Sequence, residues 1–221
     1  MGGRKLQRML AGRGISIGRD QLLDLLSANG LLVRPIRNYR RTTNSYHRFR
    51  KYRNIVKDCP PQAPLETFVS DITYISTREG FCYLALVTDL YSRKIVGWDL
   101  CRTLAIEGSL RALNMALKGL PDQHQLIHHS DRGIQYCSQS YVDLLTKNNV
   151  RISMTEDNHC YENAVAERVN GILKDEFSLG QTLPSFKIAL ELITQAVTTY
   201  NHDRLHCSLH YQTPDSCHAA A

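Results

Sequence analysis

The sequence predicts an α/β fold: a mixed five-stranded sheet flanked by helices and preceded by a small helical segment. Three runs rich in β-branched and aromatic residues follow one another from residue 67, joined by "STREG" and "YS". Runs of this kind with short connections are typical of an antiparallel meander. After them, helical and strand patterns alternate, which places helices on the faces of a sheet.

The elements are expected in the following order. "RKLQRMLAGRGISIGRDQLLDLLSANG" predicts two helices around a turn, with Gly30 as the C-cap of the second. Such a pair fits a helix-turn-helix, although any helical hairpin has a similar pattern. Ser138 and Pro184 are expected as N-cap and N1 of two later helices. Strands are expected at 67–75, 81–90, 93–100, 125–130 and 150–154, and further helices at about 105–119, 138–149, 161–178 and 184–202.

Charge divides the chain into a basic front and an acidic body. Residues 1–57 carry 14 lysines and arginines against two aspartates, a net charge of +12, and the remainder carries −6. A basic segment with helical pattern favours nucleic-acid binding over a solvated arm. Arg19, Arg40 and Arg41 are candidate DNA contacts in it. "CPPQAP" at 59–64 marks a boundary, so we expect a DNA-binding segment and linker at 1–57.

Composition indicates an ordinary globular chain. No stretch reaches the ~18 apolar residues of a membrane helix, and the beginning, "MGGRKLQRML", lacks the pattern of a signal peptide. Seven scattered cysteines without a C-x-x-C pair indicate reduced thiols. We therefore expect a cytoplasmic protein without a membrane partner.

Three acids are candidate metal ligands. Asp71 interrupts an apolar strand, where a carboxylate is costly unless a charge compensates it. Asp131 ends the strand in "HHSDRGIQY", and Glu167 lies on a helix; 59 residues separate the first two acids and 35 the last two. Phosphodiester transfer can use two Mg²⁺ ions held by such carboxylates. Taken singly, each acid could instead be a solvated surface residue. Competing candidates for the third ligand or a turn are Asp89, Glu156, Asp157 and Glu162.

The motifs resemble a known family. "DITYI", "HHSDRGIQY" and "ENAVAERVNGILKDEF", with their spacing, are similar to the D,D(35)E core of retroviral integrases and insertion-sequence transposases. The residues of these motifs most closely resemble those of the second-frame transposase of the insertion-sequence-three family, and the resemblance covers nearly the whole chain. The resemblance implies a ribonuclease-H-like core at 65–180, followed by a C-terminal helix and tail at 181–221. It also implies DNA strand transfer with Mg²⁺ or Mn²⁺, two ions being expected.

Residue by residue, the resemblance makes Asp71, Asp131 and Glu167 the catalytic metal ligands. Lys174, seven residues after Glu167 and on the same helical face, matches a basic residue that contacts DNA phosphate. Arg132 is expected to shape the turn and touch DNA. Asn163 either orients the glutamate or a nucleotide, or belongs to the helix start. His129 either supports the metal site as a second-shell residue or is a buried structural histidine.

The tail resembles the family's terminal motif through Asn201, Arg204 and His206. Leu205 stands where proline is usual, and family members usually carry further residues before the point where this chain begins. A zinc site among the tail's histidines and cysteines is the alternative, although the two required ligand pairings are not both present.

The sequence therefore predicts a DDE transposase that binds element ends and target DNA. A homo-oligomer on DNA and a first-frame helix-turn-helix protein of the same element are the expected partners. Two alternatives stay open: a nuclease of the same fold that only hydrolyses, and an inactive or truncated remnant that only binds DNA.

Overall fold

One mixed five-stranded sheet organises the protein. The computed structural model describes residues 2–32, 47–121, 124–156 and 163–219. Its strands lie in the order β3-β2-β1-β4-β5. Strands β1 to β3 pair antiparallel, whereas β4 and β5 run parallel to β1. This confirms the meander followed by two added strands. The strands are β1 (Thr67–Thr77), β2 (Gly80–Asp89), β3 (Ile95–Cys101), β4 (Ile127–Ser130) and β5 (Arg151–Met154).

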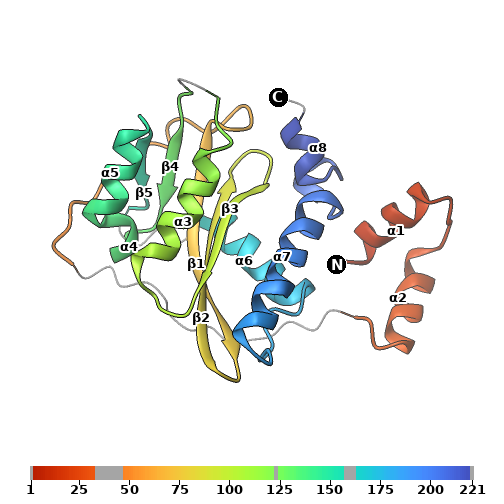
Figure 1. Ribbon diagram of the computed structural model, residues 1–221. Helices are drawn as coiled ribbons and strands as arrows, with labels where there is room; N and C mark the ends of the chain where they lie inside the picture. The colour runs from red at the N-terminus through yellow and green to blue at the C-terminus, as the bar shows by residue number, and fades with distance from the viewer. Residues whose placement is uncertain (1, 33–46, 122–123, 157–162, 220–221) are drawn as a thin grey trace.

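Helices cover both faces of the sheet. One core lies beneath α3 (Ile106–Leu117), α4 (Ile134–Cys137) and α5 (Gln139–Lys147), and contains Phe68 of β1. The other lies beneath α6 (Ala164–Glu176) and α7 (Phe186–His202), and contains Ile75 of the same strand. Because side chains alternate along a strand, even-numbered residues of β1 face the first group and odd-numbered residues face the second. Figure 1 shows α3 in front of the sheet and α6 behind it.

The packing of α3 depends on a glycine. A Cβ added at Gly97 of β3 would lie 2.1 Å from the Ala112 carbonyl oxygen and 2.9 Å from the Ala116 nitrogen. No side chain fits there, because both neighbours are backbone atoms of the helix. "SRKIVGW" therefore carries its glycine where helix and edge strand come closest.

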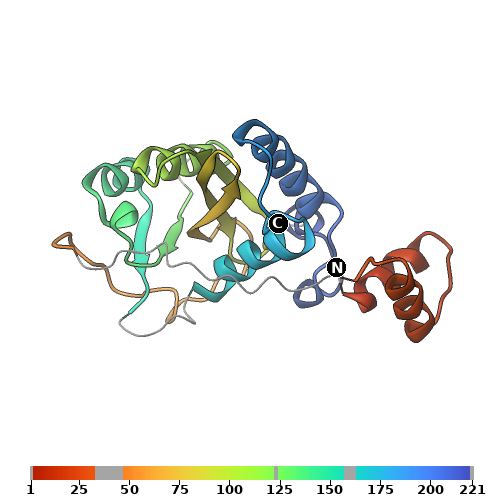
Figure 2. The same ribbon diagram turned by 90° about the horizontal axis from the view of Figure 1, so that it is seen from below.

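The basic front begins with a pair of helices. These are α1 (Gly3–Gly12) and α2 (Arg19–Ala28), with only Leu22 of α2 fully buried in them. Gly30 has a φ of 65° and follows the actual C-cap residue, Asn29. Figures 1 and 2 both show the pair beyond the C-terminal elements, away from the sheet. The helical hairpin expected from the sequence is thus present.

Several boundaries differ from the expectation. Ser138 is the N-cap residue of α5, as expected, although its hydroxyl donates to the Gln135 carbonyl at 2.8 Å instead of accepting from a helix amide. Pro184 is not the first residue of α7, because Ser185 is the N-cap and its hydroxyl accepts from the Ile188 amide. The short helices α4, η2 (Cys207–Leu209) and α8 (Pro214–Ala219) were not foreseen. None of the helices within the described ranges is long and apolar enough to cross a membrane.

Candidate active site

Strand pairing brings Asp71 and Asp131 together. Ser70 of β1 lies opposite Ser130, the last residue of β4, in the parallel register, so Asp71 and Asp131 each follow one of these paired residues. Asp71 lies on the odd-numbered face of β1, which α6 covers, and the alternation of side chains along β4 predicts the same face for Asp131. Two acids separated by 59 residues in sequence are therefore neighbours at the point where β4 ends.

Asp71 is held by two hydrogen bonds. Its Oδ1 accepts from the Ile72 amide at 2.9 Å, and its Oδ2 accepts from Asn170 Nδ2 at 2.7 Å. Asn170 is buried, and its Oδ1 has no hydrogen-bond partner among the residues described. The α6 side chain thus fixes the orientation of the strand carboxylate.

The turn after β4 fixes Asp131. Its Oδ1 accepts from the Gly133 amide at 2.9 Å. A Cβ at Gly133 would lie 2.9 Å from that same oxygen. The side chain is short and already hydrogen-bonded, so it has little room to move away. The glycine in "SDRG" therefore leaves space for the carboxylate, and α4 begins directly after it.

Helix α6 presents a polar face to the two aspartates. Glu167 lies in its first turn and is exposed, and Asn170 and Lys174 follow at intervals of three and seven residues. These intervals put all three on one side of the helix. Lys174 is half-buried, with its Nζ 4.0 Å from the centre of the Tyr74 ring. The face thus carries an acid, an amide and a cation along β1.

The carboxylates repel one another. Burial, followed by the charge of Asp131, raises the pKa of Asp71 to about 7, with a smaller contribution from Glu167. Burial and Asp131 also raise the pKa of Glu167. Hard oxygen donors that carry negative charge and lie near one another fit a divalent cation. Within the described ranges, however, no three His, Cys, Asp or Glu side chains are gathered closely enough to hold an ion. The three-ligand site stays a prediction.

The other predicted residues lie around this edge. Asn163 precedes α6, and its Nδ2 donates to the Ser70 carbonyl at 3.1 Å, which ties the helix start to β1. Arg132 is half-buried, and its carbonyl accepts from His47 Nε2 at 2.9 Å. His129 is buried with its Nδ1 2.8 Å from Ser153 Oγ. Their predicted DNA-binding and second-shell roles stay predictions.

The two histidines of "HHSDRG" face opposite sides. His128 Nε2 lies 2.7 Å from Ser70 Oγ and 3.0 Å from Tyr141 Oη, so this ring faces α5 and locks β1 to β4. Burial lowers its pKa to about 3, which keeps the ring neutral. Only His129 shares the face of Asp131, in agreement with the expected alternation.

The competing acids are placed as follows. Asp89 is fully buried at the end of β2, and its carboxylate accepts from the Leu65 amide and from the amide and hydroxyl of Ser92. It is a turn residue. Glu156 follows β5 and is half-buried. Asp157 and Glu162 lie outside the described residues, as do Arg40 and Arg41.

Comparison with known proteins shows the family of this chain. Two models of the integrase core domain match residues 61–160 and 148–214. The "Insertion element IS600 uncharacterized 31 kDa protein" of Shigella sonnei is 36% identical over 210 residues, covering 94% of this chain and 77% of the relative. "Transposase InsF for insertion sequence IS3A" of Escherichia coli (strain K12) is 31% identical, covering 93% and 72%.

The chain belongs to the integrase-core transposases of the insertion-sequence-three family. A putative transposase for the element IS986/IS6110 of Mycobacterium tuberculosis agrees, at 33% identity over 93% of this chain and 76% of that protein. Solved structures support the ribonuclease-H-like fold. The HTLV-2 integrase catalytic core in complex with magnesium matches with a TM-score of 0.57 at 19% identity, covering 71% of this chain and 98% of that one.

The tail residues Asn201, Arg204 and His206 hold parts of the structure together in this transposase. Asn201 bonds both backbone groups of Ile95 at 2.9 Å, which seals part of the edge strand β3. Arg204 is fully buried and bonds both oxygens of Glu176, at 2.8 and 2.9 Å. Arg204 Nη1 also bonds His206 Nε2 at 3.0 Å. The motif thus attaches the tail to α6 and the sheet.

One residue of the site escaped the sequence analysis. Asn170 bonds Asp71, but the sequence analysis does not name this residue. Its interval of three from Glu167 was the available signal, because residues three apart on a helix share a face. The strand partner could not be known before the helix was placed against β1.

Proposed function

We propose that this transposase is catalytically competent and performs metal-dependent DNA strand cleavage and strand transfer. Asp71, Asp131 and Glu167 would be its catalytic carboxylates. The observation that supports this most directly is that Asp71 and Asp131 each follow one of the paired residues Ser70 and Ser130, at the point where β4 ends. The side of α6 that starts with Glu167 faces the same point.

The donor set is suited to Mg²⁺ or Mn²⁺, and two ions are expected. Bound there, the metal would activate an oxygen nucleophile and stabilise the leaving oxygen of the phosphodiester. Magnesium is present in the HTLV-2 integrase core of similar fold. Asp71 and Asp131 would hold the metal from the sheet, and Glu167 from the helix.

The neighbouring side chains orient these acids and the DNA. Asn170 holds the Asp71 carboxylate in one orientation, and the Gly133 amide does the same for Asp131. Lys174 stacks against Tyr74 beside the acids, where its ammonium group can meet a DNA phosphate. Burial lowers the Lys174 pKa while Asp71 raises it. The positive charge of the lysine would therefore attract both the Asp71 carboxylate and the phosphates of incoming DNA.

The test compares strand joining by wild type and Asp131→Asn. Labelled duplexes carrying the terminal repeats that flank the gene would be incubated with target DNA in Mg²⁺, Mn²⁺ or EDTA. Wild type should cleave and join only with metal. Asp131→Asn should lose at least about 1000-fold, the upper range for removing one electrostatic stabiliser, since its amide is a poor metal ligand.

DNA binding by the Asp131→Asn variant should persist, because removing an acid does not weaken phosphate contacts. Asp143→Asn, an exposed acid of α5, is the matched control and should behave as wild type. Strand transfer by Asp131→Asn in Mg²⁺ would contradict the metal-ligand role. Cleavage by wild type without joining would favour the nuclease, and binding without cleavage the inactive remnant.

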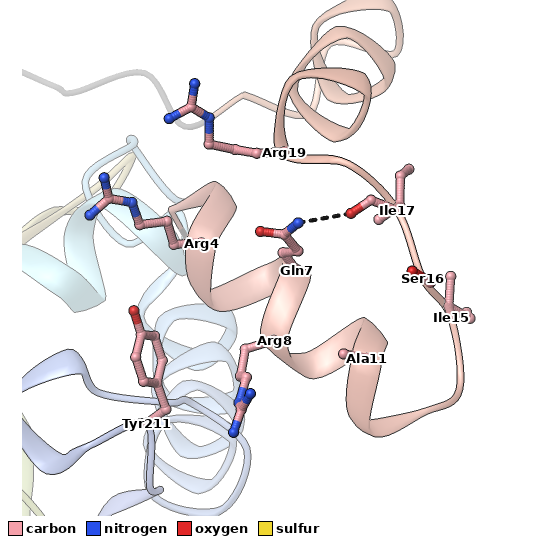
Figure 3. Close-up of a pocket in the computed structure, with 9 residues that line it drawn as sticks. All are labelled: Arg4, Gln7, Arg8, Ala11, Ile15, Ser16, Ile17, Arg19 and Tyr211. Atoms are coloured by element: carbon pink, nitrogen blue, oxygen red, sulfur yellow. Dashed lines mark hydrogen bonds between the residues drawn. The ribbon is translucent and has the colours of Figure 1, made fainter.

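We further propose that the helical pair grips the DNA backbone. An open pocket of about 650 Å³ lies between α1, the following turn and the C-terminal segment. Arg4, Arg8 and Arg19 line it together with Tyr211, as Figure 3 shows. Gln7 Nε2 donates to the Ile17 carbonyl at 2.8 Å and holds the turn in place. Three guanidinium groups around one pocket suit DNA phosphates.

Salt dependence tests this grip. The double variant Arg4→Ala with Arg8→Ala should lower the slope of log affinity against log salt by up to about 1.8, since each lost phosphate contact removes about 0.9. Lys187→Ala, an exposed cation of α7, is the control that should keep the slope. An unchanged slope in the double variant would place the phosphate contacts elsewhere.

Assembly is proposed by likeness. A structure of the simian T-cell lymphotropic virus intasome in complex with a PP2A regulatory subunit matches 96% of this chain with a TM-score of 0.60 at 20% identity. We propose that this transposase likewise acts as a homo-oligomer on DNA, together with a first-frame protein of its element. Light scattering of the chain with and without terminal-repeat DNA would reveal such assembly.

A further inference from the structure

The segment at residues 47–58 does not hang freely between the helical pair and the catalytic sheet. We call it the strap. Within the sequence it belongs to the basic front, yet one hydrogen bond fastens it to the turn that follows Asp131 and another fastens it to β5. Figure 1 shows the described part of this connection, coloured orange, reaching the side of the sheet where β4 and β5 lie.

The first anchor is on the catalytic turn itself. His47 Nε2 lies 2.9 Å from the Arg132 carbonyl oxygen, across 85 residues of sequence. A carbonyl only accepts, so Nε2 carries the proton and donates. Arg132 lies between Asp131 and Gly133, the two residues joined by the carboxylate–amide bond. The imidazole therefore holds the backbone of the turn that orients Asp131.

The second anchor is on β5. Asn54 is buried, and its Oδ1 accepts from the amides of Val56 and Lys57, which folds the strap into a tight turn. The Ile55 amide donates to Ser153 Oγ at 3.0 Å. The same hydroxyl lies 2.8 Å from Nδ1 of His129, two residues before Asp131. The strap is thus hydrogen-bonded both to the turn after β4 and to β5.

The strap is also strongly basic. Its cations are exposed, and its single acid, Asp58, pairs with one of them, Arg53, at 2.8 Å. Arg50 stacks over the Tyr52 ring, with the guanidinium carbon 5.0 Å from its centre. This surface therefore offers phosphate contacts directly beside an acidic site that by itself would repel DNA. The cations are Arg48, Arg50, Lys51, Arg53 and Lys57.

We propose that His47 is a positioning residue that couples DNA bound on the strap to the Asp131 turn. The inference rests on the proposed strand-transfer function and extends it to a second set of residues. DNA phosphates held by the strap cations are kept in fixed register with the carboxylates, because the strap is bonded to the turn. Binding in turn steadies the 131–133 backbone, because the strap loses freedom when it grips DNA.

Hydrogen exchange tests the coupling without requiring catalysis. The full-length wild type would be measured with and without a short mixed-sequence duplex. We expect DNA to slow amide exchange in the peptide that spans residues 131–137, and His47→Ala to lose this protection while still binding the duplex. His47→Gln should retain it, since its amide can donate to the same carbonyl.

A matched control is available at the other end of the strands. His124 Nε2 lies 2.9 Å from the Leu65 carbonyl oxygen, the same type of bond over a long sequence separation. His124→Ala should leave the DNA-induced protection at 131–137 intact. Protection lost equally in both histidine variants, or absent in wild type, would overturn the coupling.

Single-turnover strand transfer at saturating DNA supplies the functional readout. His47→Ala should lower this rate about 10- to 100-fold, the range for small misplacement of reacting groups, with unchanged DNA affinity. An affinity loss with a normal rate at saturation would show that His47 acts in binding alone and overturn the positioning role. If wild type transfers no strands, the proposed function fails, while the exchange result still decides the coupling.

Discussion

Acids that lie at or beside the two ends of α6 have pKa values shifted in opposite directions. At its C-terminal end, burial would raise the pKa of Glu176, but bonds to Arg204 and the charge of that guanidinium outweigh burial and lower it. Beside its N-terminal half, the pKa of Asp71 rises to about 7 because burial and Asp131 act in the same direction. One acid has a buried cation as its hydrogen-bonded partner, whereas the other has an amide as partner, with two further acids and the half-buried Lys174 nearby.

The opposite pKa shifts distinguish an acid that stabilises the fold, Glu176, from an acid of the candidate site, Asp71. A buried acid with a matched cation stabilises a contact, here the docking of the C-terminal tail on α6. Buried acids that face each other weaken the fold unless a cation joins them, and such an arrangement is typical of a functional site. The same helix therefore serves to attach the tail at one end and to build the candidate metal site at the other.

The largest expected effect on stability comes from breaking the matched pair. Arg204→Met should lower the free energy of unfolding by about 3–5 kcal/mol, because Glu176 stays largely buried and loses both hydrogen bonds to the guanidinium group. Arg204 is 1% exposed and Glu176 13%, whereas the control pair, Arg102 and Glu79, is 61% and 43% exposed. Arg102→Ala should therefore cost less than about 1 kcal/mol. Urea unfolding of both variants measures the difference.

The double variant Arg204→Met with Glu176→Gln tests whether the cost comes from the charge of the buried carboxylate. If the cost arises from the buried carboxylate that has lost its guanidinium, the double variant should regain part of the lost stability. Equal costs for Arg204→Met and Arg102→Ala would show that the buried pair does not secure the tail.

Removing the carboxylate of Asp71 should change the free energy of unfolding in the opposite direction. Asp71→Asn should stabilise the protein by on the order of 2 kcal/mol at neutral pH while abolishing strand transfer. The asparagine keeps only one acceptor oxygen, so one of the two hydrogen bonds from the Ile72 amide and Asn170 Nδ2 is lost, and this loss offsets part of the gain. Asp143→Asn, exposed on α5, should change neither property. Destabilisation by Asp71→Asn in the absence of metal would mean that the carboxylate is compensated after all.

Most of the fold could be predicted because its signals are local. β-Branched runs and helical periodicity located the five strands and the long helices, and the interval from Asp131 to Glu167 singled out the acid on α6. Short elements such as α4 and α8 lack enough residues for a period. Pro184 was misjudged because the serine after it supplies the actual cap.

The supporting residues of the site could not be predicted, because their partners are distant in sequence. Asn170 bonds Asp71 across 99 residues, Ile55 bonds Ser153 across 98, and His47 bonds the Arg132 carbonyl across 85. Nothing in the local pattern of an asparagine or a serine indicates such a bond. They become apparent only once β1, β4 and β5 are aligned and α6 is packed against them.

The smallest expected effect distinguishes the two regions by their response to pH. His206 lies in the tail, and its Nε2 accepts from Arg204 Nη1, so the ring must be neutral. Burial, and then the charge of Arg204, lower its pKa from 6.5 to about 3. The unfolded chain therefore binds the proton more readily than the folded one. The stability that the neutral ring contributes is complete above about pH 6.5 and is lost as the pH falls toward 3.

Asp71 has the opposite dependence. Its folded pKa of about 7 exceeds the ordinary value of 3.8, so its destabilising effect is absent at low pH and grows as the pH rises from about 4 to 7. Urea unfolding of wild type, His206→Gln and Asp71→Asn across this range separates the two. The penalty from His206 should reach about 1 kcal/mol near pH 5.5. Relative to wild type, His206→Gln should lose less stability on acidification, and Asp71→Asn should lose more. If both variants had the same dependence of stability on pH as wild type, then neither His206 nor Asp71 would affect stability through its charge, and the contrast between the tail and the site would be wrong.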